Sequence, residues 1–405
     1  MKVKSGHYLH CLHLAPLVLA VTAAHANPND SLQLSAAYSL SHDDNLFRLT
    51  DKNSAPALVG RSSPAETIKT AVGGLRFERD YGLQHVKLDA SAVNYDYQNF
   101  SYLGFSAFNY NGVLQWQLTP RFRGMVISKR EESLNSFGDV RNFSVRNQRI
   151  TKYNALDATY ELDGAWRVRG ALSRIDLQNS ATILEQRSFT INSADIGLVR
   201  QFSSRSELSY RYRKGSGEYS AVSFAATGFL PSSYDESEHE LRMLWLVTDK
   251  TKLDSRVSYL QKKYNEFNFR DNSGITASSN LDWSVTSRVN LQVGLARDRT
   301  DFQSLYSSFA TIDKLTILPR WQIKEKLSMS LRHEISKRDF KGNVPTVLTT
   351  ARREDNEKLT RLSLDWVPRE FISVSTWLQR RSRDSNFTGF PYTSNSVGLD
   401  AQISF

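Results

Sequence analysis

Apolar and polar residues alternate along most of this chain. From Phe108 to Leu118 every second residue is apolar or glycine, and the residues between them are mostly Asn and Gln. The same pattern runs from Trp166 to Leu172, from Leu241 to Val247 and from Val289 to Leu295. Because successive side chains of a β-strand point to opposite faces, we expect strands that are apolar on one face and polar on the other.

Two kinds of connection separate these runs. Tight turn-like clusters recur at intervals of roughly forty residues, at 80–82, 119–121, 163–164, 203–205, 248–250, 286–288, 324–326 and 368–370. Between them lie long polar connections, at 43–66, 130–150, 176–189, 214–233, 262–273, 298–311, 336–356 and 384–392. Short turns on one side and long loops on the other are typical of outer-membrane barrels.

The turns also give the number of strands. The eight tight turns join sixteen strands, and the runs Leu32 to Leu40 and Val397 to Phe405 raise the total to eighteen. We therefore predict an all-β fold, a transmembrane antiparallel up-and-down β-barrel of about 18 strands. A soluble β-sandwich or propeller is the alternative. Aromatic residues that gather near the short turns, such as Trp283, favour the membrane barrel because they suit a girdle at headgroup level.

The N-terminus has the three parts of a secretory signal: a basic start, an apolar stretch from Leu12 to Ala24, and an Ala-His-Ala site. We predict a signal peptide at residues 1–26 and an outer-membrane β-barrel at residues 27–405, located in the bacterial outer membrane. The single cysteine, Cys11, lies inside the signal. The mature chain is therefore neither a disulfide scaffold nor a thiolate–metal protein.

The charge is strongly basic, with a formal net charge of +10. Export argues against a nucleic-acid partner, so we expect the positive charge to line a pore or surface that handles anions. The strand pattern directs many arginines inward, namely Arg76, Arg121, Arg123, Arg167, Arg169, Arg211, Arg213, Arg242, Arg256, Arg320, Arg332, Arg361 and Arg381. It also directs acids inward, namely Glu78, Asp89, Asp157, Glu161, Asp195, Asp254, Asp282, Glu334, Asp365 and Asp400.

Three Arg-x-Arg triplets stand out among the inward arginines. Guanidinium groups match carboxylates and phosphates, so the triplets predict an anion path along the lumen. The alternative is that the arginines pair with inward acids and only stiffen the wall. The predicted path consists of Arg121, Arg123, Arg167, Arg169, Arg211 and Arg213.

The sequence offers little for an enzyme. The four histidines outside the signal are scattered, and no spacing typical of a catalytic triad or a metal site joins them. We predict no catalytic residue, no metal and no cofactor. One cluster, His42-Asp43-Asp44-Asn45, could form an acid–histidine dyad or a Ca²⁺ site at the outer mouth. Such residues after a strand more often cap a turn through their side-chain oxygens.

The same segment carries a family resemblance. Asp43, Asp44, Asn45, Phe47 and Arg48 follow the first strand, and a barrel of this size follows them. Together they resemble the EpsL-like outer-membrane barrels of exopolysaccharide operons, within the β-barrel porin group. The resemblance implies a role in exopolysaccharide export or assembly and brings no catalytic residues.

Two functions follow as expectations. The first is an outer-membrane channel for export or assembly of an extracellular, acidic polysaccharide. The alternative is a general or anion-selective porin for small-solute uptake, or a non-conducting structural barrel. The expected partners are the polysaccharide substrate, outer-membrane lipid, other exopolysaccharide export components and the barrel-assembly machinery. Phe405, an aromatic residue at the end of the last alternating run, resembles the assembly signal that this machinery reads.

Overall fold

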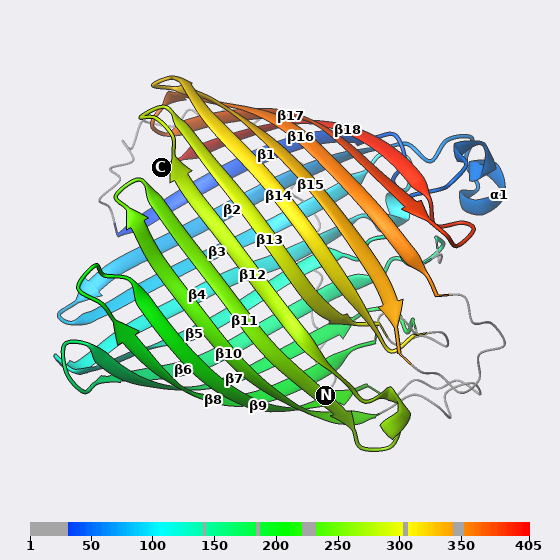
Figure 1. Ribbon diagram of the computed structural model, residues 1–405. Coiled ribbons are helices and arrows are strands. Elements are labelled where there is room, and N and C mark those ends of the chain that lie inside the picture. The colour runs from blue at the N-terminus through cyan, green and yellow to red at the C-terminus, as the bar shows by residue number, and fades with distance from the viewer. Residues whose placement is uncertain (1–30, 141–142, 184–186, 221–231, 303–306, 343–351) are drawn as a thin grey trace, which may run out of the picture.

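The computed structural model describes residues 31–140, 143–183, 187–220, 232–302, 307–342 and 352–405, so the expected signal peptide lies outside the described residues. The described chain forms one closed antiparallel barrel of eighteen strands, as predicted (Figure 1). The strands are β1 (Leu32–Asp43), β2 (Glu66–Tyr81), β3 (Gln84–Tyr97), β4 (Phe105–Thr119), β5 (Phe122–Leu134), β6 (Gln148–Glu161), β7 (Trp166–Asn179), β8 (Phe189–Gln201), β9 (Glu207–Tyr219), β10 (Ser233–Thr248), β11 (Thr251–Tyr264), β12 (Asn272–Ser284), β13 (Val289–Asp301), β14 (Phe309–Lys324), β15 (Leu327–Lys341), β16 (Glu354–Arg369), β17 (Ile372–Ser385) and β18 (Tyr392–Ser404).

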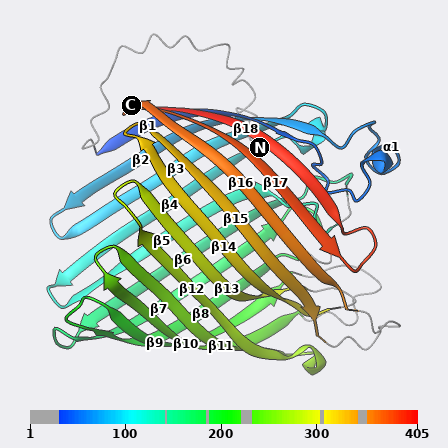
Figure 2. The same ribbon diagram turned by 45° about the horizontal axis from the view of Figure 1, so that its top comes forward.

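The ring closes between β1 and β18. Each strand pairs with its neighbours in the sequence, and β1 pairs with both β2 and β18. Figure 2 shows β1 beside β18 at this seam. There the backbone N–H groups of Leu34 and Phe405 each donate to the carbonyl oxygen of the other at 2.8 Å. Closure matters because an open barrel would leave unpaired strand edges in lipid.

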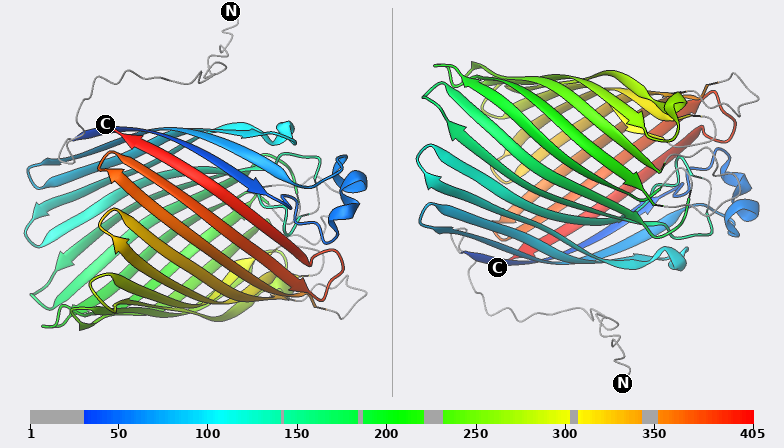
Figure 3. Two further views of the ribbon diagram at one scale, coloured as in Figure 1. Left: turned by 90° about the horizontal axis from the view of Figure 1, so that it is seen from above. Right: turned by 90° about the horizontal axis from the view of Figure 1, so that it is seen from below.

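The two ends of the barrel differ. The tight turns and the C-terminus lie at one end, called here the turn end, and the short helix α1 (Ala55–Val59) lies at the other, the loop end (Figure 3). The other helical segments among the described residues are the short turns η1 (Lys52–Ser54), η2 (Ser101–Leu103) and η5 (Asn268–Arg270). No helix in the described ranges is long and apolar enough to cross a membrane.

The outer face of the wall is apolar over the half nearest the turn end. Large apolar side chains stand exposed there, including Leu172 (59% exposed) and Ile196 (60%). Trp283 and Trp366 are exposed outward close to the tight turns. In water this exposure would be costly, whereas a lipid hydrocarbon core with an aromatic girdle at its border accommodates it.

The strands reach further towards the loop end than the alternation predicts. β9 continues to Tyr219, well into the connection expected at 214–233. There the outward residues are polar (Lys214, Ser216) and glycines face inward. The ladder of backbone hydrogen bonds continues although the apolar pattern has ended, because an outer face above the lipid has no reason to be apolar.

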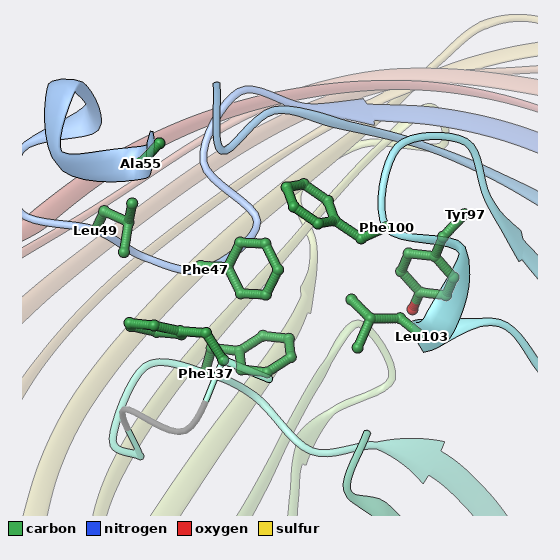
Figure 4. Close-up of a cluster of buried hydrophobic side chains, with 8 residues drawn as sticks. Phe47, Leu49, Ala55, Tyr97, Phe100, Leu103 and Phe137 are labelled. Atoms are coloured by element: carbon green, nitrogen blue, oxygen red, sulfur yellow. The ribbon is translucent and has the colours of Figure 1, made fainter. Parts of the chain in front are cut away.

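The apolar core lies under the loops at the loop end, not in the middle of the barrel. Phe47 is fully buried and packs edge-on against Phe100, with ring centroids 4.6 Å apart, and against Phe137 at 4.7 Å (Figure 4). Leu49 and Leu103 complete the buried cluster from two of the same three loops. Three connections that are far apart in the sequence are thereby held together over one end of the lumen.

Deleting Phe405 is expected to impair assembly. The deletion removes both hydrogen bonds to Leu34 and leaves the seam open at the turn end. The heat-modifiable, folded band on an SDS gel should fall by roughly half or more. As a control, Phe202→Ala removes an exposed outward aromatic residue elsewhere at the turn end and should leave most of the barrel folded. Equal amounts of folded barrel after the deletion would show that assembly depends on another element.

Candidate functional site

The predicted anion path follows the inner face of three strands with one exception. Register partners share a face, and the exposed apolar residues mark the outer one. On this basis Arg123, Arg167, Arg169 and the β9 arginines face the lumen. Arg121 instead lies in the tight turn between β4 and β5, outside any strand.

The inward arginines on β5 and β7 have acidic partners. Arg169 lies 3.1 Å from Asp157, and Arg167 reaches across β8 to Glu207, also at 3.1 Å. Arg123 is 3.7 Å from a carboxylate oxygen of Glu161. These guanidinium groups stiffen the wall, as the alternative reading of the sequence expected, and have less capacity left for a passing anion.

The β9 arginines form a denser ladder with β10. Arg213 Nη1 lies 2.6 Å from Glu236, and its Nε donates to Glu238 at 3.0 Å. Arg211 donates to Glu240 at 2.9 Å. All three glutamates are buried, so each charge is compensated by a close partner. Two arginines thus face three glutamates, with Arg256 of β11 3.8 Å from Glu240 as a further cation. This part of the predicted path is therefore an interlocked wall without free positive charge.

A different set of luminal arginines lies on β15, β16 and β17. Arg332 and Arg361 are register partners, and Arg381 lies two residues beyond Gln379, the β17 partner of Arg361. We call these three the arginine cluster. Only Arg332 has an ion pair within the described chain, with Glu334 at 2.8 Å. The Arg361 guanidinium instead stacks 4.2 Å from the ring centroid of Trp377.

The nearest inward acids leave this cluster largely uncompensated. Asp365 accepts a hydrogen bond from Ser375 at 2.7 Å. Asp400 accepts one from the Trp377 indole N–H at 3.1 Å and another from the Ser39 hydroxyl. Their oxygens are therefore engaged by neutral donors, and the guanidinium groups of Arg361 and Arg381 keep donors for a solute.

One loop crosses the lumen to the same wall. The inner loop, described at residues 135–140 and 143–147, lies between β5 and β6, and its Asp139 contacts β15, which is eight strands away around the shorter side of the ring. The carboxylate of Asp139 lies 2.8 Å from Arg338 Nη1, 2.9 Å from Arg353 Nη2 and 3.0 Å from Arg383 Nη1. The Gly138 carbonyl accepts a further bond from Arg383 at 2.7 Å. We call these contacts the latch.

The latch carboxylate is strongly favoured in its ionised form. Burial alone would raise the pKa of Asp139, but the three surrounding arginines lower it to about 2. Phe137 and Phe143, which precede and follow Asp139 in the sequence, pack into the buried cluster around Phe47. The loop is thus fixed to two parts of the wall and narrows the loop end of the lumen.

The residues of the predicted family motif hold the first loop, which joins β1 to β2, against β18. Asp43 binds Arg48 at 2.8 Å, and the buried Asn45 donates to the Thr393 carbonyl at 3.0 Å. Arg48 takes a left-handed backbone conformation with φ of 57°, which turns the chain so that Phe47 enters the buried cluster.

The second part of the motif adds another contact with β18. Asp44 accepts hydrogen bonds from Asn395 at 2.8 and 2.9 Å. Burial raises the pKa of Asp44, yet these bonds and Lys52 hold the pKa below its usual value. The motif therefore closes the seam at the loop end.

The possible dyad at the outer mouth does not form. Consecutive strand residues point to opposite faces, so His42 faces outward and Asp43 inward. His42 Nδ1 bonds the Thr67 hydroxyl at 3.0 Å. Among the described residues, no group of three or more His, Cys, Asp or Glu is placed to hold a metal ion.

Comparisons with known proteins support this architecture. A family model described as "Putative beta-barrel porin 2" matches residues 244–405, which is less than half of the chain. The crystal structure of the outer-membrane protein OpdK from Pseudomonas aeruginosa covers 92% of this chain and 99% of its own, with 12% identity and a TM-score of 0.50. A BenF-like porin from Pseudomonas fluorescens Pf-5 covers 93% and 99%, with 10% identity and a TM-score of 0.52.

This chain is a bacterial outer-membrane barrel of the porin fold. Identities this low show the fold alone, so they transfer no substrate. A search of curated proteins finds no match. The comparisons thus support the broader β-barrel porin group, and none of them supports the finer resemblance to EpsL-like exopolysaccharide barrels.

The sequence predicts that the three arginines of the cluster face inward, but no sequence feature distinguishes them from the other inward arginines. Each triplet is conspicuous because its two arginines are close in sequence, whereas the cluster is assembled from three strands. Asp139 gave no signal at all, because a loop has no periodic pattern. A count of inward arginines per strand against inward acids on the neighbouring strands would have pointed to β15–β17.

Proposed function

We propose that this barrel is an anion-selective porin for small carboxylate solutes. The observation that carries the proposal is the latch, where three arginines of the β15–β17 wall surround the carboxylate of Asp139 at 2.8–3.0 Å. The arginine cluster lies closer to the turn end on β15, β16 and β17, where two of the latch arginines lie and the third, Arg353, directly precedes β16, and it offers similar donors in the open lumen. A solute carboxylate passing the inner loop would meet these donors next.

Two solved relatives of the fold agree with this choice of solute. OpdK has been crystallised with vanillate, and OpdF (OccK2) from the same organism, which covers 93% of this chain and 99% of its own at 11% identity and a TM-score of 0.51, with glucuronate. Both ligands carry a carboxylate. For the present chain these ligands support only the class of solute, a small carboxylate, because the luminal residues of the three proteins are not compared at this identity.

Polysaccharide export, the first expectation from sequence, receives less support. A latched loop that spans the mouth of the barrel suits a small solute better than a polymer chain. No comparison points to an exopolysaccharide system. The ladder on β9 and β10 sets three glutamates against two arginines, so it also offers no continuous basic track for an acidic polymer.

Solute flux into liposomes tests the proposal. With purified barrel reconstituted, benzoate is expected to enter severalfold faster than benzamide, which has nearly the same size and no charge. Salt-gradient reversal potentials in planar bilayers should show anion selectivity. Equal rates for the two solutes would contradict carboxylate preference, and an absence of conductance would favour a non-conducting structural barrel.

A further inference from the structure

The outer wall carries an open groove of about 850 Å³ across β5 to β10. Its apolar part is made by outward side chains of neighbouring strands. Among them, Leu156 on β6 is the register partner of both Val126 on β5 and Leu172 on β7. All three are exposed on the outside of the barrel. The groove is therefore a feature of the lipid-facing surface and separate from the lumen.

Two cations lie at the loop-end border of this groove. Arg174 follows Leu172 by one outward position on β7, and Lys214 lies on β9; both side chains are exposed. Neither has an ion pair within the described part of the chain. Their cross-strand partners on the groove side are neutral polar groups: Asn154 and Asn192 are the register partners of Arg174, and Asn192 also pairs with Ser216 beside Lys214.

Some of the other outward cations at this height are paired with acids. Arg297 forms a bidentate pair with Asp313 at 2.6 and 2.8 Å. Lys337 lies 3.2 Å from Glu354. The one acid in the groove, Asp235, lies opposite Lys263 in the register of β10 and β11. The groove thus combines an apolar floor with two cations that form no ion pair with any residue the structure describes.

The wall beside the groove has unusually small side chains. Gly124, Ala158 and Gly170 are register partners in one row across β5, β6 and β7, on the outward face and nearer the turn end. The Trp116 indole covers Gly124, where an added Cβ would lie 2.5 Å from Trp116 Cζ2, whereas no side chain lies within 4 Å of a Cβ added at Gly170. The apolar floor on which an acyl chain would lie is made by Val126, Leu156 and Leu172.

We infer that this groove binds a phosphorylated glycolipid of the outer leaflet, with a phosphate between Arg174 and Lys214. The cations lie where the apolar half of the wall ends, on the side of the long loops, which is the level of the outer-leaflet headgroups. Arginine and lysine are the side chains that bind phosphate, and asparagine and serine donors suit sugar hydroxyls. The apolar floor then receives the acyl chains.

Lipid binding to the purified barrel tests this inference. Native mass spectrometry in detergent compares lipopolysaccharide with phosphatidylglycerol and phosphatidylethanolamine for the wild type and for Arg174→Gln/Lys214→Gln. Lipopolysaccharide should bind the wild type best, and the double variant should bind it about tenfold or more weakly. The matched control is Lys358→Gln/Arg380→Gln, which removes two exposed outward cations on β16 and β17, away from the groove.

Each outcome bears on the inference. An unchanged affinity in the groove variant would overturn it, and so would an equal loss in the control variant, because binding would then reflect a diffuse ring of charge. Equal binding of phosphatidylglycerol would show that any lipid phosphate suffices and would reject a glycolipid site. Heat-modifiability of both variants shows whether they remain folded. The result is independent of which solute passes through the lumen.

Discussion

Replacing Asp139 by asparagine is expected to raise the single-channel conductance about twofold or more. The substitution keeps the size of the side chain but removes the charge that three arginines hold at 2.8–3.0 Å. Arg353 and Arg383 would keep their pairs with Asp355 and Glu357, so they lose little by releasing the loop. The inner loop would keep its aromatic contacts and the bond from Arg383 to the Gly138 carbonyl, but it would be held more weakly and would move out of the lumen for part of the time.

Planar bilayer recordings give the measurement, and Asp384→Asn is the matched control. Asp384 is an exposed residue of β17 that forms no ion pair with any other described residue. The control should conduct like the wild type. If Asp139→Asn also conducts like the wild type while remaining heat-modifiable, the latch does not restrict the lumen.

The latch also has a defined pH range. The pKa of Asp139 is lowered from 3.8 to about 2 in the folded barrel. A lowered carboxyl pKa gives a contribution that is complete above about pH 4 and is lost as the pH falls through about 2. Conductance should therefore be constant between pH 5 and 8 apart from other titrating groups, and opening by acid should require a pH near 2.

Removing the uncompensated arginines should have the largest effect on selectivity. In Arg361→Gln/Arg381→Gln the lumen loses two charges whose donors are free of carboxylates, so the preference for anions should fall about fivefold. The faster entry of benzoate over benzamide should disappear in the same variant. Reversal potentials and liposome flux measure the two effects separately.

The control for this variant keeps the net charge constant. Arg169→Gln/Asp157→Asn removes one luminal arginine together with its partner at 3.1 Å. Because the pair is neutral as a unit, selectivity and flux should stay close to those of the wild type. If both double variants changed selectivity equally, or neither did, the arginine cluster would not be the solute site.

The sequence predicts the barrel well because a spanning strand imposes a strict period of two. Eighteen strands, the closed all-β fold and the inward direction of residues such as Arg167 and Arg213 all follow from that period. The period does not give the vertical register of neighbouring strands. For that reason the partners of these arginines, such as Glu207 two strands away from Arg167, could not be read from the pattern.

The loop end was beyond sequence reasoning for a different reason. Above the lipid the outward face becomes polar, so the alternation fades while β9 continues to Tyr219. The inner loop has no period, and nothing in the residues around Asp139 indicates that they reach β15. The first loop shows the opposite case. The family resemblance points to Asp43 and Asn45, and in the structure these residues help to hold the loop against β18 at the seam.

The seam between β1 and β18 has a consequence for the covalent order of the chain. Leu34 and Phe405 exchange backbone hydrogen bonds at the turn end, so the described polypeptide nearly forms a circle. A short linker across this seam, with new termini opened in another tight turn such as Asp163-Gly164, would keep every strand pair and both faces of the wall. Such a circular permutant would separate two properties that coincide here, the closing contact of the ring and the position of Phe405 at the end of the chain.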